Sequence, residues 1–173
     1  DLTLFSGDYR AGERTFDLLT QAAGRAGRGD VPGKVVIQTY KPDNYAITAA
    51  ASQDYRAFYD IEEAYRSLMR YPPEWNMMVI MGTGMDEEQL ANIMDRMYSL
   101  IRGKYINAGH LSVIGPSEPA ISKIKDVYRR VLYIKHRDYR MLVDVKDYVE
   151  EWLKENGEND VSVFFDLNPV NMY

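Results

Sequence analysis

Two arginines with glycine neighbours are the residues of this sequence best suited to chemistry. Arg25 and Arg28 lie three residues apart in QAAGRAGRGD, and Gly24 and Gly27 directly precede them. A glycine lets the backbone beside each arginine come close to a ligand. A guanidinium presents a planar fork of donors that matches two phosphate oxygens, and it stabilises charge during phosphoryl transfer. The alternative is a helix C-terminus whose arginines only complement the dipole, and the motif alone leaves both readings open.

Size and composition narrow the class of protein. The chain has 173 residues, which suits one ordinary domain or a small domain plus part of another. It has no cysteine, which excludes disulfides and thiolate metal sites, and two histidines make a histidine-rich metal site unexpected. No apolar run approaches the ~20 residues of a membrane span, and the N-terminus has no secretion signal. We therefore expect a cytoplasmic protein, and we interpret the chain as part of a longer one because it lacks an initiating Met.

Charge is distributed unevenly along the chain. The net charge of −5 argues against a strongly basic nucleic-acid binder, yet residues 123–140 are rich in lysine and arginine. A strand over 127–136 would place Arg129 and Lys135 on one surface with Tyr133, offering charge for phosphates and a ring for a base. The alternative is a solvated sheet face with extended arginines. In an otherwise acidic chain the cluster favours contact with DNA or an acidic peptide, through Arg129, Arg130, Tyr133, Lys135, Arg137 and Arg140.

The first part of the chain reads as helix, strand and helix. Apolar spacing predicts a helix over 12–27, β-branched residues predict a strand over 34–40, and helical spacing returns over 45–70. On this second helix the pair Glu62 and Glu63 has no nucleophile nearby, so we expect a solvated face. Pro72-Pro73 ends the helix, because proline cannot continue one. This predicts a domain boundary, with one domain over 1–72 and another over 73–173.

The second part alternates regularly. The pattern predicts strands over 77–81, 110–115, 127–136 and 161–167, and amphipathic helices over 86–102 and 138–155. The order strand, helix, strand, strand, helix, strand is typical of the split βαβ arrangement of ferredoxin-like folds. The expected fold class of the whole chain is α+β.

The residues around the arginines resemble a known motor family. Gln21, Gly24, Arg25, Gly27 and Arg28 match motif VI of superfamily 2 helicases. The ordered flanks then resemble the C-terminal part of the primosomal protein N′ (PriA) family of replication-restart DNA helicases. These flanks are Asp8-Tyr9-Arg10, the strand ending at Tyr40, Arg70-Tyr71-Pro72-Pro73, Val113-Ile114-Gly115-Pro116 and Asp166-Leu167-Asn168-Pro169.

The resemblance implies roles for the motif. Arg25 and Arg28 would be catalytic arginine fingers that meet ATP bound mainly to the other motor lobe, and Gln21, Gly24 and Gly27 would belong to the nucleotide site. Residues 1–72 would be the end of the second RecA-like lobe. The intact helicase would use ATP and Mg²⁺ and would hold zinc, with the P-loop, the acidic magnesium box and the zinc-binding cysteines upstream. We therefore expect the chain alone to hold no cofactor and to be inactive as an ATPase.

The resemblance also implies partners. These are branched or single-stranded DNA, the tail of single-stranded-DNA-binding protein and other primosome proteins in the bacterial cytoplasm near the nucleoid, with no membrane partner. Arg140 is the candidate for a tail carboxylate. The sequence departs from the family pattern at Gly7, where proline is usual, and at Asn168, where aspartate is usual. The alternative function is a non-catalytic module that binds RNA or belongs to a ribosome-like assembly.

Overall fold

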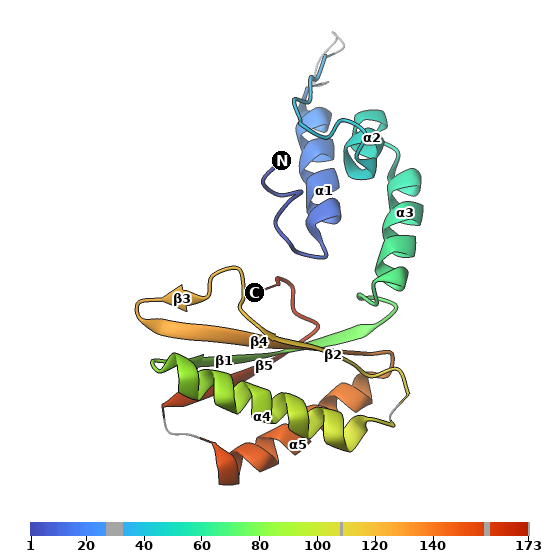
Figure 1. Cartoon of the computed structure of the whole chain (residues 1–173). Coiled ribbons are helices and arrows are strands. Elements are labelled where there is room, and N and C mark those ends of the chain that lie inside the picture. Colours follow the sequence, from blue (N-terminus) through green and yellow to red (C-terminus); the bar gives the residue numbers. More distant parts are fainter. Residues whose placement is uncertain (27–32, 108, 158–159, 173) are drawn as a thin grey trace. The chain divides into compact units, whose positions relative to one another are not determined.

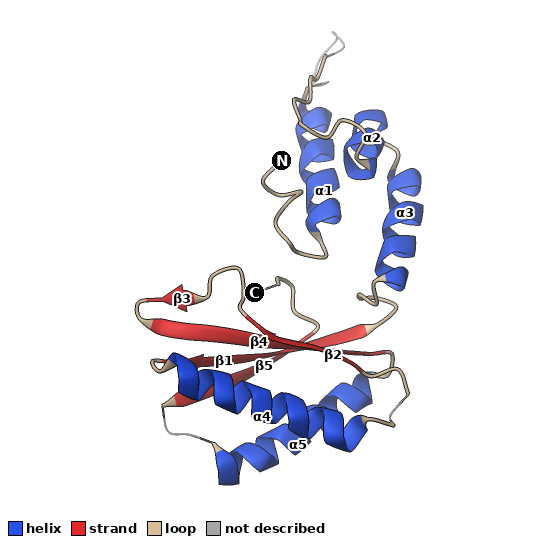
Figure 2. Cartoon of the chain, in the orientation of Figure 1, coloured by secondary structure: helices blue, strands red, loops and turns tan. Residues whose placement is uncertain are grey.

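A computed structural model describes residues 1–26, 33–107, 109–157 and 160–172. Within it the chain forms two compact units, one over Asp1–Met69 together with Met172 and one over Arg70–Asn171. The first unit is helical and the second combines a sheet with two helices, as Figures 1 and 2 show. The α+β class expected from the sequence is confirmed.

Three helices make up the first unit: α1 (Ala11–Arg25), α2 (Tyr45–Ser52) and α3 (Tyr55–Leu68). Their small core centres on Phe16 of α1 and Phe58 of α3, whose rings stack with centroids 4.4 Å apart. The alanines of α2 complete it, since Ala46, Ala49 and Ala50 are buried against these rings. Side chains of this size allow the short helix to approach the two longer ones closely.

The prediction of one helix over 45–70 is wrong, because α2 and α3 are separate. The break lies at Gln53, whose φ is 55° and whose backbone N–H bonds to the carbonyls of Ala49 and Ala50. Asp54 then begins α3, accepting a hydrogen bond from Ala57 N at 2.9 Å. The apolar spacing runs on through the break because both helices bury residues in the same core. The signal for the break was the aspartate N-cap.

The strand predicted over 34–40 is also wrong. The backbone there has no regular secondary structure, and Val36 is 80% exposed. Among the described residues, no backbone hydrogen bond joins residues 34–39 to another segment. A strand depends on a neighbour with which to exchange hydrogen bonds, so β-branched residues without one are left as open chain.

The second unit has the element order β1 (Asn76–Gly84), α4 (Glu87–Tyr105), β2 (Ser112–Ser117), β3 (Lys123–Ile124), β4 (Val127–His136), α5 (Tyr139–Asn156) and β5 (Val161–Leu167). The sheet runs β2-β4-β1-β5, with every pairing antiparallel, and β3 pairs with β4. The predicted bounds of β4 and β5 are confirmed, and the other predicted elements are present with ends shifted by a few residues. Asp86 and Asp138 act as N-caps of the two helices.

The main core of this unit lies between the sheet and its helices. Figure 2 shows α4 and α5 on the same face of the sheet. Alternate residues of β1 and β4 point into that layer and are fully buried there, among them Met78, Ile80, Leu132 and Ile134. The other residues of the central strands form a smaller cluster, because Val79, Met81 and Val131 are also buried. The two central strands therefore bury apolar residues on both of their faces.

The short strand β3 was missed by the sequence reasoning. It is joined to β4 by the two-residue turn Lys125-Asp126, where φ is 48° and 65°. Two consecutive positive φ values belong to the turn that best matches the twist of a hairpin. That turn usually contains Asn-Gly or Asp-Gly, so Lys-Asp did not indicate a hairpin in the sequence.

Candidate functional site

The predicted nucleotide-facing residues lie at the end of α1. Gln21 and Arg25 are four residues apart on this helix, both exposed, and Gly24 beside them has open space around its Cα. The buried residues of α1 are Ala11, Gly12, Thr15 and Phe16, all in the first half of the helix. The side chain of Arg25 makes no hydrogen bond or ion pair with any residue that the structure describes. Gly27 and Arg28, also predicted to belong to this site, lie outside the described residues.

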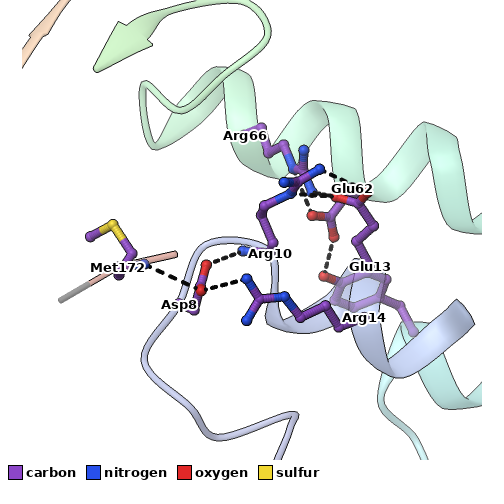
Figure 3. A network of polar contacts seen from close by, with 8 residues as sticks. Asp8, Arg10, Glu13, Arg14, Glu62, Arg66 and Met172 are labelled. Atoms are coloured by element: carbon purple, nitrogen blue, oxygen red, sulfur yellow. Dashed lines mark hydrogen bonds and ion pairs between the residues drawn. The ribbon is translucent and has the colours of Figure 1, made fainter. Parts of the chain in front are cut away.

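A polar network fixes the other end of α1 (Figure 3). Arg66 of α3 is its centre, donating from Nε to Glu62 Oε1 and from Nη2 to Glu13 Oε2, each at 2.7 Å. Glu62 also accepts a hydrogen bond from the Tyr45 hydroxyl at 2.5 Å. The guanidinium of Arg66 lies over the ring of Tyr9, 5.4 Å from its centroid. One buried arginine thus joins residues of all three helices.

Two more arginines extend the network to the segment before α1. Arg10 pairs with Glu13 at 3.2 Å, and Arg14 pairs with Asp8 at 3.0 Å. Asp8 also accepts the backbone N–H of Arg10 at 2.9 Å, which places a carboxylate at the start of the helix. This position is favourable because the first N–H groups of a helix have no partner within it. The segment around Asp8 is held firmly where it enters α1.

The electrostatics of the network suit a structural role. Burial acts to raise the pKa of Glu13, but hydrogen bonds from Arg66 and Arg10 outweigh it, so the pKa is lowered. Burial and the hydrogen bond to Glu62 raise the pKa of the Tyr45 hydroxyl. Glu13 is thus held as an anion and Tyr45 as a neutral donor. These groups orient α1 and do not offer a free base.

The expectation that Glu62 lies on a solvated face is wrong, since only 5% of the residue is exposed. Two spacings carried the signal: Glu62 follows the core residue Phe58 by four positions and precedes Arg66 by four. Residues four apart share a face of a helix, so Glu62 lies with Phe58 on the buried side. Its neighbour Glu63 accepts a hydrogen bond from the exposed Tyr59.

The predicted basic surface is divided between two faces of β4. Arg129, Tyr133 and Lys135 share one face and Arg130 lies on the other, where its guanidinium is 3.9 Å from Glu87 Oε1. Arg129 donates to the carbonyl of Ile121 at 3.1 Å, Tyr133 is half-buried, and Lys135 is 5% exposed. Arg137 and Arg140 follow the strand and are exposed. The structure does not gather these six side chains into one open surface.

Within the described parts of the chain, no three His, Asp or Glu side chains are grouped so that they could hold a metal ion. Over the same residues, no helix combines the length and apolar character needed to cross a membrane.

Comparison with known proteins gives a consistent set of similarities. The family model for the primosomal protein N C-terminal domain matches residues 67–170. Replication restart protein PriA of Bacillus subtilis is 34% identical over 174 residues, which cover 99% of this chain and 21% of that protein. The protein of the same name from Chlamydia trachomatis is 32% identical over 173 residues, covering 100% of this chain and 22% of that protein. The chain thus spans about a fifth of the length of these relatives.

Among solved structures, the designed protein Foldit4 aligns with 54% of this chain and 97% of its own, with 18% identity and a TM-score of 0.39.

Proposed function

The chain belongs to the primosomal protein N C-terminal domain family, and from this we propose that it acts as the C-terminal portion of an ATP-dependent DNA helicase that restarts stalled replication forks. The relatives of matching sequence carry the name replication restart protein PriA. In this proposal, residues 1–72 belong to the second RecA-like lobe and residues 73–173 form a ferredoxin-like domain. The strand order β2-β4-β1-β5, with two helices on one face, supports the second assignment.

The open segment over residues 34–40 supports the first assignment. Its β-branched composition suits a strand, and it has no pairing partner among the described residues. We propose that its partners are strands of the same lobe that precede this chain in the whole protein. The exposed Val36 would then pack inside that lobe.

The observation that carries the proposal is the state of Arg25. It is an exposed guanidinium without a protein partner among the described residues, on a helix whose far end is fixed by buried ion pairs. Such a group is free to engage a phosphate, and its helix is held in one orientation. We propose that Arg25 and Arg28 reach the γ-phosphate of ATP bound to the other motor lobe, with Gln21 beside them. ATP is the substrate here, and this chain has no phosphate-binding loop of its own.

Substitution of Arg25 in the full-length protein tests this function. We expect Arg25→Ala and Arg28→Ala each to lower DNA-stimulated ATP hydrolysis by about 10³-fold or more, the contribution typical of an arginine finger. Arg25→Lys should not restore it, because lysine lacks the fork. DNA affinity should stay unchanged.

Arg56→Ala is the matched control, since Arg56 is an exposed arginine of the same unit whose one ion pair among the described residues is with Asp60, four residues on. Its ATP hydrolysis should equal that of the unsubstituted protein. Hydrolysis within about tenfold of normal in Arg25→Ala would contradict the role, because a finger contributes far more than that. The 173-residue chain alone should not hydrolyse ATP, and measurable turnover by it would contradict the need for a second lobe.

A further inference from the structure

The strand β5 forms one edge of the sheet in the second unit (Figure 1). It pairs with β1 over its whole length, Val161–Leu167, without a break in register. In the described part of the chain, β1 is the one strand with which it pairs. The other side of β5 therefore presents a row of backbone N–H and C=O groups. Such a row is a template for another strand.

The two edges of this sheet differ in how they are protected. β2, at the opposite edge, contains Pro116, and its register with β4 shifts between Ile114 and Ser117. Proline, lysine and bulges are devices with which natural proteins prevent unwanted strand addition. β5 contains no proline, lysine or arginine and has no bulge. An edge left open opposite a protected one points to a strand that binds there.

Both faces of β5 leave apolar surface for an added strand. On the face away from the helices, Phe164 is 58% exposed. On the helix side, Val163 and Phe165 pack against the main core but remain partly exposed, whereas Met78 and Ile80 of the neighbouring β1 are fully buried. A strand beside β5 would cover these residues in the way that β5 covers β1, and burial of apolar area would stabilise it.

The charges at the start of β5 indicate the chemistry of the partner. An open hollow of about 730 Å³ lies there, lined by Met85, Asp86, Glu88, Gln89, Asn92 and Asp160. Asp160 directly precedes β5, so a chain that runs along the edge and past Val161 reaches this hollow. Asp86 is used as the N-cap of α4. Glu88 and Asp160 make no ion pair with any described residue, and none of the lining side chains is a cation.

We propose that the edge of β5 binds an extended, basic segment of a partner protein, which adds a strand antiparallel to β5 and places its C-terminal lysine or arginine residues near Glu88 and Asp160. Every pairing in this sheet is antiparallel, and that order brings the C-terminal end of the added strand to Val161. Main-chain hydrogen bonds supply affinity in this mode of recognition, and side chains supply specificity. A second copy of this chain fits less well, because its β5 has no cation to offer the two carboxylates. The proposal goes beyond the ATP chemistry of Arg25 and does not depend on it.

A designed peptide tests the site in the 173-residue chain. The labelled peptide TVTVTVKK has the alternation of a strand followed by two lysines, and its binding is measured by fluorescence anisotropy. We expect saturable binding at low salt that is about tenfold tighter than that of TVTVTVSS, the effect of two exposed ion pairs. KKVTVTVT, which carries its lysines at the other end, should bind no better than TVTVTVSS. On binding, the amides of residues 161–165 that point away from β1 should gain protection from hydrogen exchange.

A lysine on the edge tests strand addition. Phe164→Lys should weaken the binding of both TVTVTVKK and TVTVTVSS by about tenfold or more, because an edge lysine opposes the pairing that both peptides need. Ile114→Lys is the matched control, since Ile114 is an exposed apolar residue of the opposite edge strand. It should leave both affinities unchanged. Circular dichroism checks that each variant is folded.

Removal of the carboxylates tests the choice of partner. Glu88→Gln with Asp160→Asn should weaken TVTVTVKK to the affinity of TVTVTVSS and leave TVTVTVSS unchanged. Asp147→Asn with Glu151→Gln is the matched control, because it removes two exposed acids of α5 that do not line the hollow. It should change neither affinity.

Three results would overturn the proposal. One is binding without new protection in residues 161–165, since the peptide would then lie elsewhere. Another is equal affinity for the three peptides, or no saturable binding of any of them. The last is a dimer of the free chain that Phe164→Lys makes monomeric, because a second copy would then occupy the edge. None of these results bears on ATP hydrolysis, so the proposed function and this proposal can fail independently.

Discussion

Arg66→Ala should destabilise the helical unit, because it leaves the buried Glu62 carboxylate without its cation. The side chain of Arg66 is 12% exposed and that of its partner Glu62 is 7% exposed. The substitution leaves the Glu62 carboxylate buried with only the Tyr45 hydroxyl described as its donor. Breaking a buried pair in this way costs about 3–5 kcal/mol. Glu13, the second partner, is 32% exposed and keeps Arg10, so it adds little. We expect a loss of about 3 kcal/mol, at the low end of that range.

Amide hydrogen exchange is the suitable assay, because it reads the stability of each unit separately. Protection of α1 and α3 should fall by about 100-fold in Arg66→Ala, since 1.36 kcal/mol corresponds to a factor of ten. Protection of β1 and β4 should stay unchanged. Arg56→Ala breaks an exposed pair and should cost less than about 1 kcal/mol.

A second variant distinguishes loss of the ion pair from nonspecific destabilisation of the unit. Glu62→Gln combined with Arg66→Met removes both charges, and apolar replacement of a buried pair is often neutral. We expect it to recover at least half of the lost protection. A fall of less than tenfold in Arg66→Ala, or no recovery in the double variant, would refute the view that Arg66 compensates a buried carboxylate.

Three further predictions concern single groups. Gly12→Ala should destabilise the first unit by about 1–3 kcal/mol, measured by the same exchange, because its new methyl would collide with the Tyr45 hydroxyl and with Glu62 Oε2. Asn168→Ala should cost the second unit about 2 kcal/mol in denaturant unfolding followed by tryptophan emission. Its φ of 51° suits asparagine, and its side chain accepts from Met77 N at 2.9 Å; a wild-type midpoint would contradict this. Because the pKa of Glu13 is lowered in the folded state, its stabilisation is present above the unfolded pKa near 4.5 and is lost as pH falls through the folded value. Protection of α1 should therefore drop in acid, and less steeply in Arg66→Ala.

The sequence predicts the second unit better than the first, for a physical reason. The helices over Leu90–Ile101 and Leu142–Leu153 bury one face each, so their periodicity is clear, and Asp86 and Asp138 mark the helix starts. In the first unit the break at Gln53 leaves the periodicity intact, and the strand expected over 34–40 has no partner here to pair with. The residue pattern of a segment shows which secondary structure that segment favours. Whether a strand forms also depends on the presence of another strand with which it can pair.

The candidate sites divide in the same way. The residues proposed for motif VI could be named from the sequence, because Gln21, Gly24 and Arg25 are close along the chain. The network around Arg66 could not, since Glu13 and Arg66 are 53 positions apart and only the folded helices bring them together. Arg70 and Arg137 likewise come together over the ring of Trp75 only in the folded chain. Lys135 was expected on an open surface with Tyr133, and β4 instead buries it beside Tyr71.

The open segment over residues 34–40 also has a consequence for how the chain behaves in concentrated solution. KVVIQTY is rich in β-branched residues, contains no proline and carries one charge. Segments with this composition stack into fibrils when their backbone is left unpaired. Natural sheets prevent such templating by placing lysine or proline at exposed edges, whereas the exposed Val36 lies next to the middle of this segment. The chain should therefore aggregate slowly through these seven residues when it is kept at high concentration. Val36→Lys should keep it in solution.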